Sequence, residues 1–166
     1  PELCFYARGV SPTDPAEFVA IAHRVVWCTL ATVDARGRPR SRLVHPVWEL
    51  TPDGPVGRVC TRATPTKRAH LAHSPFASTS YWDPRHDVAV AEGAAAWDPE
   101  PAASWQVFSA PPPPVGFDPA AVFAGGLDDP QAAVILLRPW RLRWAHAVDL
   151  AAGREHAVWR PSPAKG

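Results

Sequence analysis

The sequence lacks the features that mark several large protein classes. It has no methionine, and its cysteines are few and widely spaced, at Cys4, Cys28 and Cys60. An odd number at this spacing forms neither a disulfide framework nor a zinc ribbon. No run approaches the ~20 apolar residues of a membrane helix. The start, PELCFYARG, lacks the basic, apolar and small-residue order of a secretory signal. We therefore expect reduced thiols, no membrane span and a cytoplasmic protein.

An excess of charge of one sign is also missing. The 17 Lys and Arg residues nearly balance 16 Asp and Glu residues, for a net charge of +1. A general nucleic-acid binder needs an excess of positive charge on one face. The motifs GxGxxG, GxxxxGK[ST], HExxH and GxSxG do not occur. His70 and His73 could share a helix face, but no Cys or carboxylate pattern completes a metal site around them. We predict neither a nucleic-acid partner nor a metal.

What the chain has in plenty is proline, with 21 residues, and tryptophan, with eight. Frequent prolines favour many short elements. Apolar periodicity and turn residues predict helices over 14–26, 65–73 and 99–110. They predict strands over 27–33, 38–50, 58–62, 76–82, 87–97 and 157–159. The segments 132–137 and 142–146 are expected to form either one strand or a hairpin around Pro139. Pro46 puts the second strand at an edge or bulge, and Gly93 is a possible bulge.

The connections between these elements indicate the fold class. The strands follow one another through short turns, which favours an antiparallel barrel over a doubly wound parallel sheet. We expect a mainly β (α+β) protein of about six strands with flanking helices, in a single domain spanning 1–166. The stretch 111–130 has no clear regular structure, and a loop of this length in a compact domain is often a lid or an interface arm.

One stretch gathers hydroxyl groups and positive charges where a helix begins. Its members lie within eight positions: Thr61, Arg62, Thr64, Thr66, Lys67 and Arg68. Unpaired N–H groups and the dipole at a helix start attract anions, and Lys or Arg neutralises them. The alternative is a solvated basic helix with polar caps. Arg38, Arg40 and Arg42 share one face of the second strand, where they meet water, a carboxylate or a phosphate.

Taken in order, several segments resemble the pyridoxamine 5′-phosphate oxidase-like split barrels, which bind FMN or a deazaflavin. These segments are LATVDARGRPRSRLVHPVWE, CTRATPTKRAHLAHSP, SYW and VAVAEGAAAW, within about 18–97. The family's arginine and apolar run falls on Arg42-Leu43-Val44, its Tyr-Thr pair on Cys60-Thr61, and its helix-opening lysine on Lys67. The resemblance implies a homodimeric split β-barrel with FMN at the interface. Arg42, Thr61 and Lys67 would hold the phosphate, and backbone groups around Leu43, Val44 and His45 would contact the ring.

The chain also departs from the family pattern. Pro65 and Thr66 stand where members often have Ser-Arg, so Arg62, Arg68 or Thr66 would supply the missing phosphate contact. Val47 replaces the lysine of the true pyridoxamine phosphate oxidases, and Arg141-Leu142-Arg143 stands where an Arg-x-His pattern is expected. The resemblance therefore implies an FMN-dependent oxidoreductase that transfers a hydride to or from another small organic substrate.

The resemblance leaves alternatives open. The chain could be a deazaflavin-dependent reductase, a non-catalytic flavin- or haem-binding protein, or a degenerate barrel that binds nothing. The cofactor carries the hydride in this chemistry, so no catalytic acid or base is assigned. Three tryptophans are candidates for lining a substrate pocket, although large aromatics are more often core: Trp48, Trp82 and Trp140.

Overall fold

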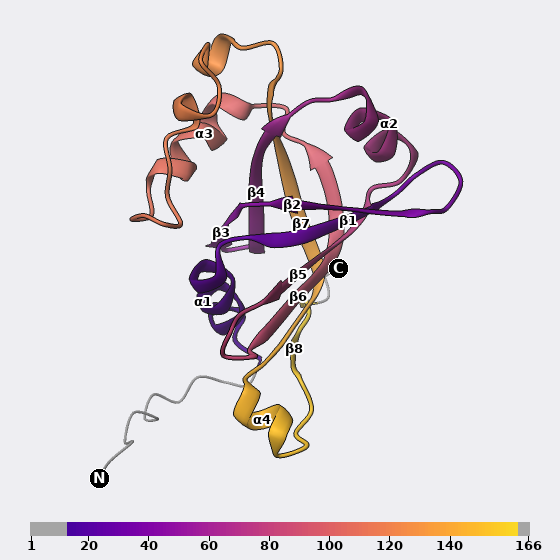
Figure 1. The fold of residues 1–166 in the computed structure, drawn as a ribbon, viewed down its shortest axis with the longest axis vertical. Coiled ribbons are helices and arrows are strands. Elements are labelled where there is room, and N and C mark those ends of the chain that lie inside the picture. The colour runs from indigo at the N-terminus through magenta and orange to yellow at the C-terminus, as the bar shows by residue number, and fades with distance from the viewer. Residues whose placement is uncertain (1–12, 163–166) are drawn as a thin grey trace.

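A computed structural model describes residues 13–162 of the chain (Figure 1). The strands are β1 (Cys28–Val33), β2 (Pro39–Val44), β3 (Pro46–Thr51), β4 (Gly54–Arg62), β5 (Phe76–Trp82), β6 (Val88–Trp97), β7 (Ala132–Ala145) and β8 (Ala157–Trp159). The helices are α1 (Pro15–Val25), α2 (Pro65–His73), α3 (Pro101–Ser109) and α4 (Ala147–Ala151), with 3₁₀ turns η1 (Pro119–Ala121) and η2 (Gly126–Asp128). None of the helices in this range has the length and apolar composition to cross a bilayer.

All eight strands belong to one antiparallel sheet that curls without closing. Its order is β2-β1-β5-β6-β7-β4-β3, with β8 paired to β7. The two ends of this order, β2 and β3, follow each other in the chain and are separated only by His45. The prediction of an antiparallel split β-barrel with flanking helices is confirmed, with eight strands instead of about six. α2 and α3 lie toward one end of the sheet, and α1 and α4 toward the other (Figure 1).

The predicted single strand over 38–50 is wrong in one respect, because it consists of two strands with different partners. Leu43 of β2 pairs with Thr29 of β1, whereas Val47 of β3 pairs with Arg58 of β4. Pro46 has no N–H to donate, so one continuous ladder cannot run through this position. The chain leaves one sheet edge at β2 and enters the opposite edge at β3, which produces the split.

The alternative of a hairpin around Pro139 is also wrong, since β7 is one strand of 14 residues. Its register against β6 shifts between Glu92 and Gly93, as a bulge at Gly93 requires. A Cβ atom at Gly93 would lie 2.7 Å from Pro139 Cα. Glycine therefore allows β6 and β7 to approach closely where proline interrupts the ladder.

The core lies between α1 and the inner face of the sheet. Asp14 caps α1 by accepting a hydrogen bond from the Ala16 N–H at 2.9 Å. Phe18 of α1 is fully buried and meets the Trp48 ring edge to face, with centroids 5.1 Å apart. Trp48 Nε1 donates to the Tyr81 hydroxyl at 2.8 Å, so this tryptophan is a core residue. Cys4 lies outside the described residues.

Candidate functional site

The turn between β4 and α2 is built by local capping. The Thr64 hydroxyl accepts a hydrogen bond from the Lys67 N–H at 3.3 Å, as an N-cap residue does. Pro65 occupies the first position of the helix, where its missing N–H is not needed and its fixed φ suits the helix. The departure from the family pattern at Pro65 therefore leaves a regular helix start.

Lys67 extends back from this helix toward the end of β4. Its Nζ donates to Thr61 Oγ1 at 2.5 Å and to the Arg62 carbonyl oxygen at 3.1 Å. Burial lowers the pKa of Lys67, and the positive charges of Arg42 and Arg62 lower it further. The ammonium group is thus held in a half-buried position by two oxygen acceptors, and the charges of Arg42 and Arg62 act on it.

Arg42 reaches the same region from β2. Its Nη2 donates to Thr32 Oγ1 at 2.7 Å and lies 3.4 Å from His70 Nδ1. Thr32 on β1 and His70 on α2 are both buried, and Thr32 Oγ1 lies 3.1 Å from His70 Nδ1. Burial lowers the pKa of Arg42, and the neighbouring charge of Arg40 lowers it further. Two separate elements therefore fix the direction of the Arg42 side chain.

We call Arg42, Arg62 and Lys67 the cationic cluster. Among the residues that the structure describes, no carboxylate forms an ion pair with any of them; the ion pairs lie elsewhere, as between Arg38 and Asp34 at 2.8 Å. A nearby like charge disfavours the charged form of a group, and a nearby opposite charge favours it. The cluster therefore offers several N–H donors and a net positive field to an anion.

Three of the remaining predicted site residues, Leu43, Val44 and His45, lie at the split, and the fourth, Thr66, lies on α2. Leu43 is 74% exposed on β2, whereas the Val44 side chain belongs to the core. The His45 ring lies between Trp27, at a centroid distance of 5.4 Å, and Phe117, at 4.9 Å. Its pKa is lowered by burial. Thr66 is exposed in the first turn of α2. The structure thus brings Arg42, Thr61, Arg62 and Lys67 together, while the His45 ring packs among aromatic residues.

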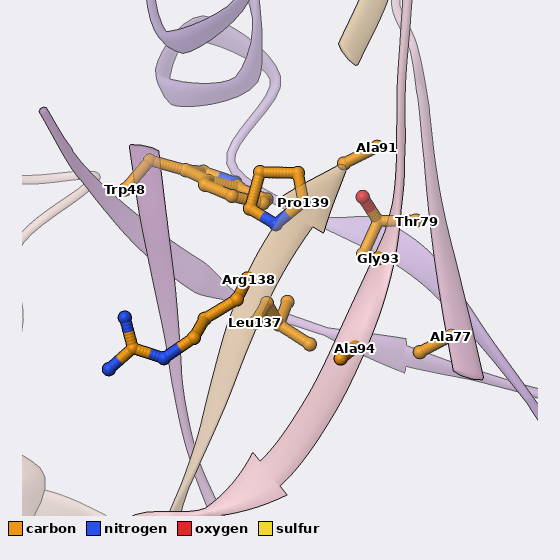
Figure 2. Close-up of a pocket in the computed structure, with 9 residues that line it drawn as sticks. All are labelled: Trp48, Ala77, Thr79, Ala91, Gly93, Ala94, Leu137, Arg138 and Pro139. Carbon is orange, nitrogen blue, oxygen red and sulfur yellow. The ribbon is translucent and has the colours of Figure 1, made fainter. Parts of the chain in front are cut away.

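The interior of the barrel has no room for a cofactor at the bulge. A cavity of about 10 Å³ lies between β5, β6 and β7, and Figure 2 shows Trp48, Leu137 and Pro139 around it. Thr79 Oγ1 is buried beside it without a hydrogen-bond partner among the described residues. A space of this size accommodates at most one water molecule.

The outer face of the sheet carries a larger depression. A groove of about 420 Å³ is lined by, among others, Phe76, Ser78, Glu92, Trp140 and Arg141. The Phe76 and Trp140 rings meet edge to face at 5.5 Å, and both are exposed. Trp82 is 60% exposed, so two of the three candidate tryptophans lie at the surface while Trp48 is in the core.

Sequence reasoning did not identify two buried partners of Arg42. Thr32 shares the buried inner face of β1 with the apolar residues Cys28 and Leu30. A buried hydroxyl group among apolar side chains needs a hydrogen-bond partner. That signal was available. The role of His70 was not, because its contact with Thr32 depends on how α2 packs against β1. Within residues 13–162, no group of three His, Cys, Asp or Glu side chains is arranged to hold a metal.

Solved structures with similar folds were found across most of the chain. A general stress protein 26-related protein of the pyridoxinephosphate oxidase family from Clostridium acetobutylicum has a TM-score of 0.67 at 10% identity, over 91% of this chain and 96% of that one. A pyridoxamine 5′-phosphate oxidase-related, FMN-binding protein from Nostoc punctiforme has a TM-score of 0.61 at 18% identity, over 94% and 100%. This chain has the pyridoxamine 5′-phosphate oxidase-like fold.

Other members of this fold group differ in what they bind. A haem-binding protein from Mycobacterium smegmatis has a TM-score of 0.58 at 23% identity, over 84% of this chain and 55% of that one. No family model and no curated protein sequence matches the chain. At these identities the pyridoxamine 5′-phosphate oxidase-like fold is established, and the ligand has to be inferred from the side chains of this chain.

Proposed function

We propose that the chain, as a single domain over 1–166, binds FMN and transfers a hydride between this cofactor and a small organic substrate. The observation that carries the proposal is the cationic cluster. Arg42 comes from β2, Arg62 from β4 and Lys67 from α2, and their charges are close enough to lower the pKa of Lys67. No carboxylate of the described residues neutralises them. Such an arrangement lacks an anion, and FMN carries one in its phosphate group.

The donors of the site fit a phosphate dianion. Two guanidinium groups and an ammonium group supply positive charge, and guanidinium matches phosphate with two parallel N–H donors. The Thr61 hydroxyl accepts from Lys67, which leaves its own O–H available to donate. The start of α2 adds the favourable end of its helix dipole. The phosphate would replace the repulsion between the three cations by attraction.

The split between β2 and β3 suits the ring of the cofactor. Each strand leaves one edge unpaired within the described chain, so backbone N–H and C=O groups around Leu43, Val44 and His45 are available to ring heteroatoms. When bound, FMN supplies a ring that accepts and donates hydride. The protein would hold the phosphate, orient the ring against these edges and shield it from water. We assign no catalytic acid or base.

The outer face of the sheet supports a homodimer with the cofactor at its interface. Four large apolar side chains are exposed there: Leu43 (74%), Phe76 (60%), Trp82 (60%) and Trp140 (44%). Leu43 pairs through Thr29 with Ser80, which shares its face with Phe76 and Trp82, so these residues point the same way. Exposed apolar surface of this kind marks interfaces. A second copy would cover it next to the split.

The thiols support a reducing, cytoplasmic setting. Cys28 and Cys60 form no disulfide, and burial raises the pKa of Cys28 to about 12 and that of Cys60 to about 11. Thiols protonated to this degree are unreactive and act as small apolar groups. Their chemistry therefore requires no oxidising environment.

An absorbance spectrum of the purified protein, followed by titration, tests the proposal. We expect flavin bands or the binding of added FMN, with much weaker binding of riboflavin, which has no phosphate. Sedimentation should give a dimer. If the protein binds a deazaflavin more tightly than FMN, the proposed phosphate site stands but the cofactor is different. A haem spectrum would favour a non-catalytic haem-binding protein. If no chromophore is present and none binds, the proposal is wrong.

A further inference from the structure

Arg62 differs from the other members of the cationic cluster because residues of the α3–β7 connection hold its guanidinium group. This residue ends β4 and pairs with Ala132, the first residue of β7. Its Nη1 donates to Gln131 Oε1 at 3.0 Å, and its Cζ lies 5.2 Å from the centroid of the Phe123 ring. One neutral acceptor and one aromatic face therefore restrain a side chain that is otherwise exposed.

The two restraining residues are themselves fixed. Phe123 is fully buried, and its ring lies 6.0 Å from that of Trp105 on α3. The Gln131 carbonyl accepts from the Ala63 N–H at 2.8 Å, and the Gln131 N–H donates to Asp129 Oδ1 at 2.8 Å. The connection is thus attached both to α3 and to the turn that begins α2.

Without such restraint, an exposed arginine side chain would sample many rotamers. Here the Arg62 carbonyl accepts a hydrogen bond from Lys67 Nζ, and the guanidinium charge contributes to lowering the pKa of Lys67. A long side chain that is already ordered loses less entropy when it binds an anion. The restraint therefore prepares the cluster for binding.

We infer that Phe123 and Gln131 are positioning residues, which hold Arg62 beside Lys67 and so set the affinity of the cationic cluster for an anionic group. The identity of that group as the FMN phosphate rests on the proposed function. The restraint itself does not, since it is a property of the ligand-free chain. Phe123 and Gln131 would then tune binding through Arg62.

A ligand-free test is possible because the chain has only two lysines, Lys67 and Lys165. Reductive methylation with ¹³C-formaldehyde and an NMR titration would follow the pKa of each. Arg62→Ala should raise the pKa of Lys67. Gln131→Leu and Phe123→Leu should raise it in the same direction, and neither should act further in the Arg62→Ala background. Gln131 is at the surface, so its variant remains informative if Phe123→Leu fails to fold.

Arg68→Ala is the matched control. Arg68 belongs to the same turn, but its Cζ lies 5.5 Å from the Trp97 ring and its charge is not among those that lower the pKa of Lys67. This variant should leave the pKa of Lys67 unchanged, and the pKa of Lys165 should be the same in every variant. An unchanged Lys67 pKa in Gln131→Leu or in Arg62→Ala would overturn the inference.

A binding test links the same residues to the phosphate. Gln131→Leu should weaken FMN binding about 3- to 10-fold, the size of one lost or loosened polar contact, and leave riboflavin binding unchanged. Equal loss for both flavins would mean a general structural effect and would count against positioning, as would tighter FMN binding. If the wild-type protein binds no FMN, the proposed function fails while the Lys67 titration still decides the inference.

Discussion

The helices α1 and α2 lie toward opposite ends of the sheet (Figure 1), and the charged residues at these two places have different kinds of partner. Near α1, Arg24 contacts Asp83 at 2.9 Å and Asp87 at 2.6 Å, and His146 lies 3.1 Å from both Asp87 and Glu17. In this group, which we call the paired network, Arg24 and His146 each meet two carboxylates. The cationic cluster at α2 has hydroxyl, carbonyl and amide partners instead of carboxylates.

The difference separates a structural role from a binding role. The paired network joins α1, the turn before β6 and the end of β7, and Asp87 also accepts the Ala147 N–H at 2.9 Å. Arg24 and His146 each have two carboxylate partners, so removing Asp87 leaves each of them with one and leaves the Ala147 N–H without its acceptor. In the cluster, the cations repel one another until an anion arrives. The paired network therefore stabilises the fold, whereas the repulsion within the cluster costs some stability, as the anion site that we propose would require.

The largest expected effect is on the cluster. Replacing Arg42 and Lys67 together by Ala should weaken FMN binding by about 3–6 kcal/mol, because two charge-assisted contacts are lost. The free energy of unfolding without ligand should stay the same or increase, because repulsion is removed. Fluorescence titration and urea unfolding measure the two quantities. Arg40→Ala, an exposed neighbour on β2, is the control, and an affinity that survives the double change would refute the site.

The paired network should respond in the reverse way. Asp87→Ala should lower the free energy of unfolding by about 1–3 kcal/mol, because Arg24 and His146 each lose one of two carboxylates and the Ala147 N–H loses its acceptor. Urea denaturation measures this change, and FMN affinity should be nearly unaffected in the folded protein. Asp149→Ala breaks an exposed pair with Arg154 and should change stability by less than about 1 kcal/mol. Equal losses of stability in the two variants would contradict a larger contribution of the paired network than of an exposed ion pair.

Acid should act on the paired network. Burial raises the pKa of Asp87, but hydrogen bonds from Ala147 and His146 and the charges of His146 and Arg24 outweigh it, and the pKa lies below the ordinary value of 3.8. A depressed folded pKa means stability that is present above the unfolded pKa and lost as pH falls through the folded one. The difference in the free energy of unfolding between wild type and Asp87→Ala, measured from unfolding curves, should therefore shrink below pH ~4.

Alkali should act on the cluster, with a smaller effect because Lys67 is partly solvated. The folded pKa of Lys67 lies below its ordinary value of 10.5, so the unfolded chain binds more protons between the two values. Stability of the ligand-free protein should rise with pH across that interval. Lys67→Met should remove this rise, and bound FMN should suppress it by raising the pKa of Lys67. A rise that persists in Lys67→Met would point to another group.

Local sequence signals predicted the bounds of several helices and strands, but not the division of 38–50 into two strands with different partners. α2 and β5 match the expected 65–73 and 76–82, because Pro65 starts the helix and Ser74-Pro75 stops it. Strands β2 and β3 were expected as one, because proline spacing does not tell which partner each segment will find. Pairing with β1 or with β4 is decided by contacts between residues that are distant in the chain.

The same division applies to the site. Thr61, Arg62 and Lys67 lie within one strand–turn–helix segment, so spacing alone could suggest that they share an anion site. The contribution of Arg42 depends on β2 forming a sheet edge and on Thr32 and His70 fixing its direction. Gln131 and Phe123 had no local signal, because they meet Arg62 only through the register of β4 against β7.

By itself, the sequence determined the ends of α2 and β5, since proline and capping residues act on the nearest few positions. It also determined that a hydroxyl-rich, basic turn precedes α2. Only the tertiary structure decided that three cations meet without a carboxylate while Arg24 and His146 are paired. Charges interact over a few ångströms of space, and for residues far apart in the chain the folding of the sheet sets that distance.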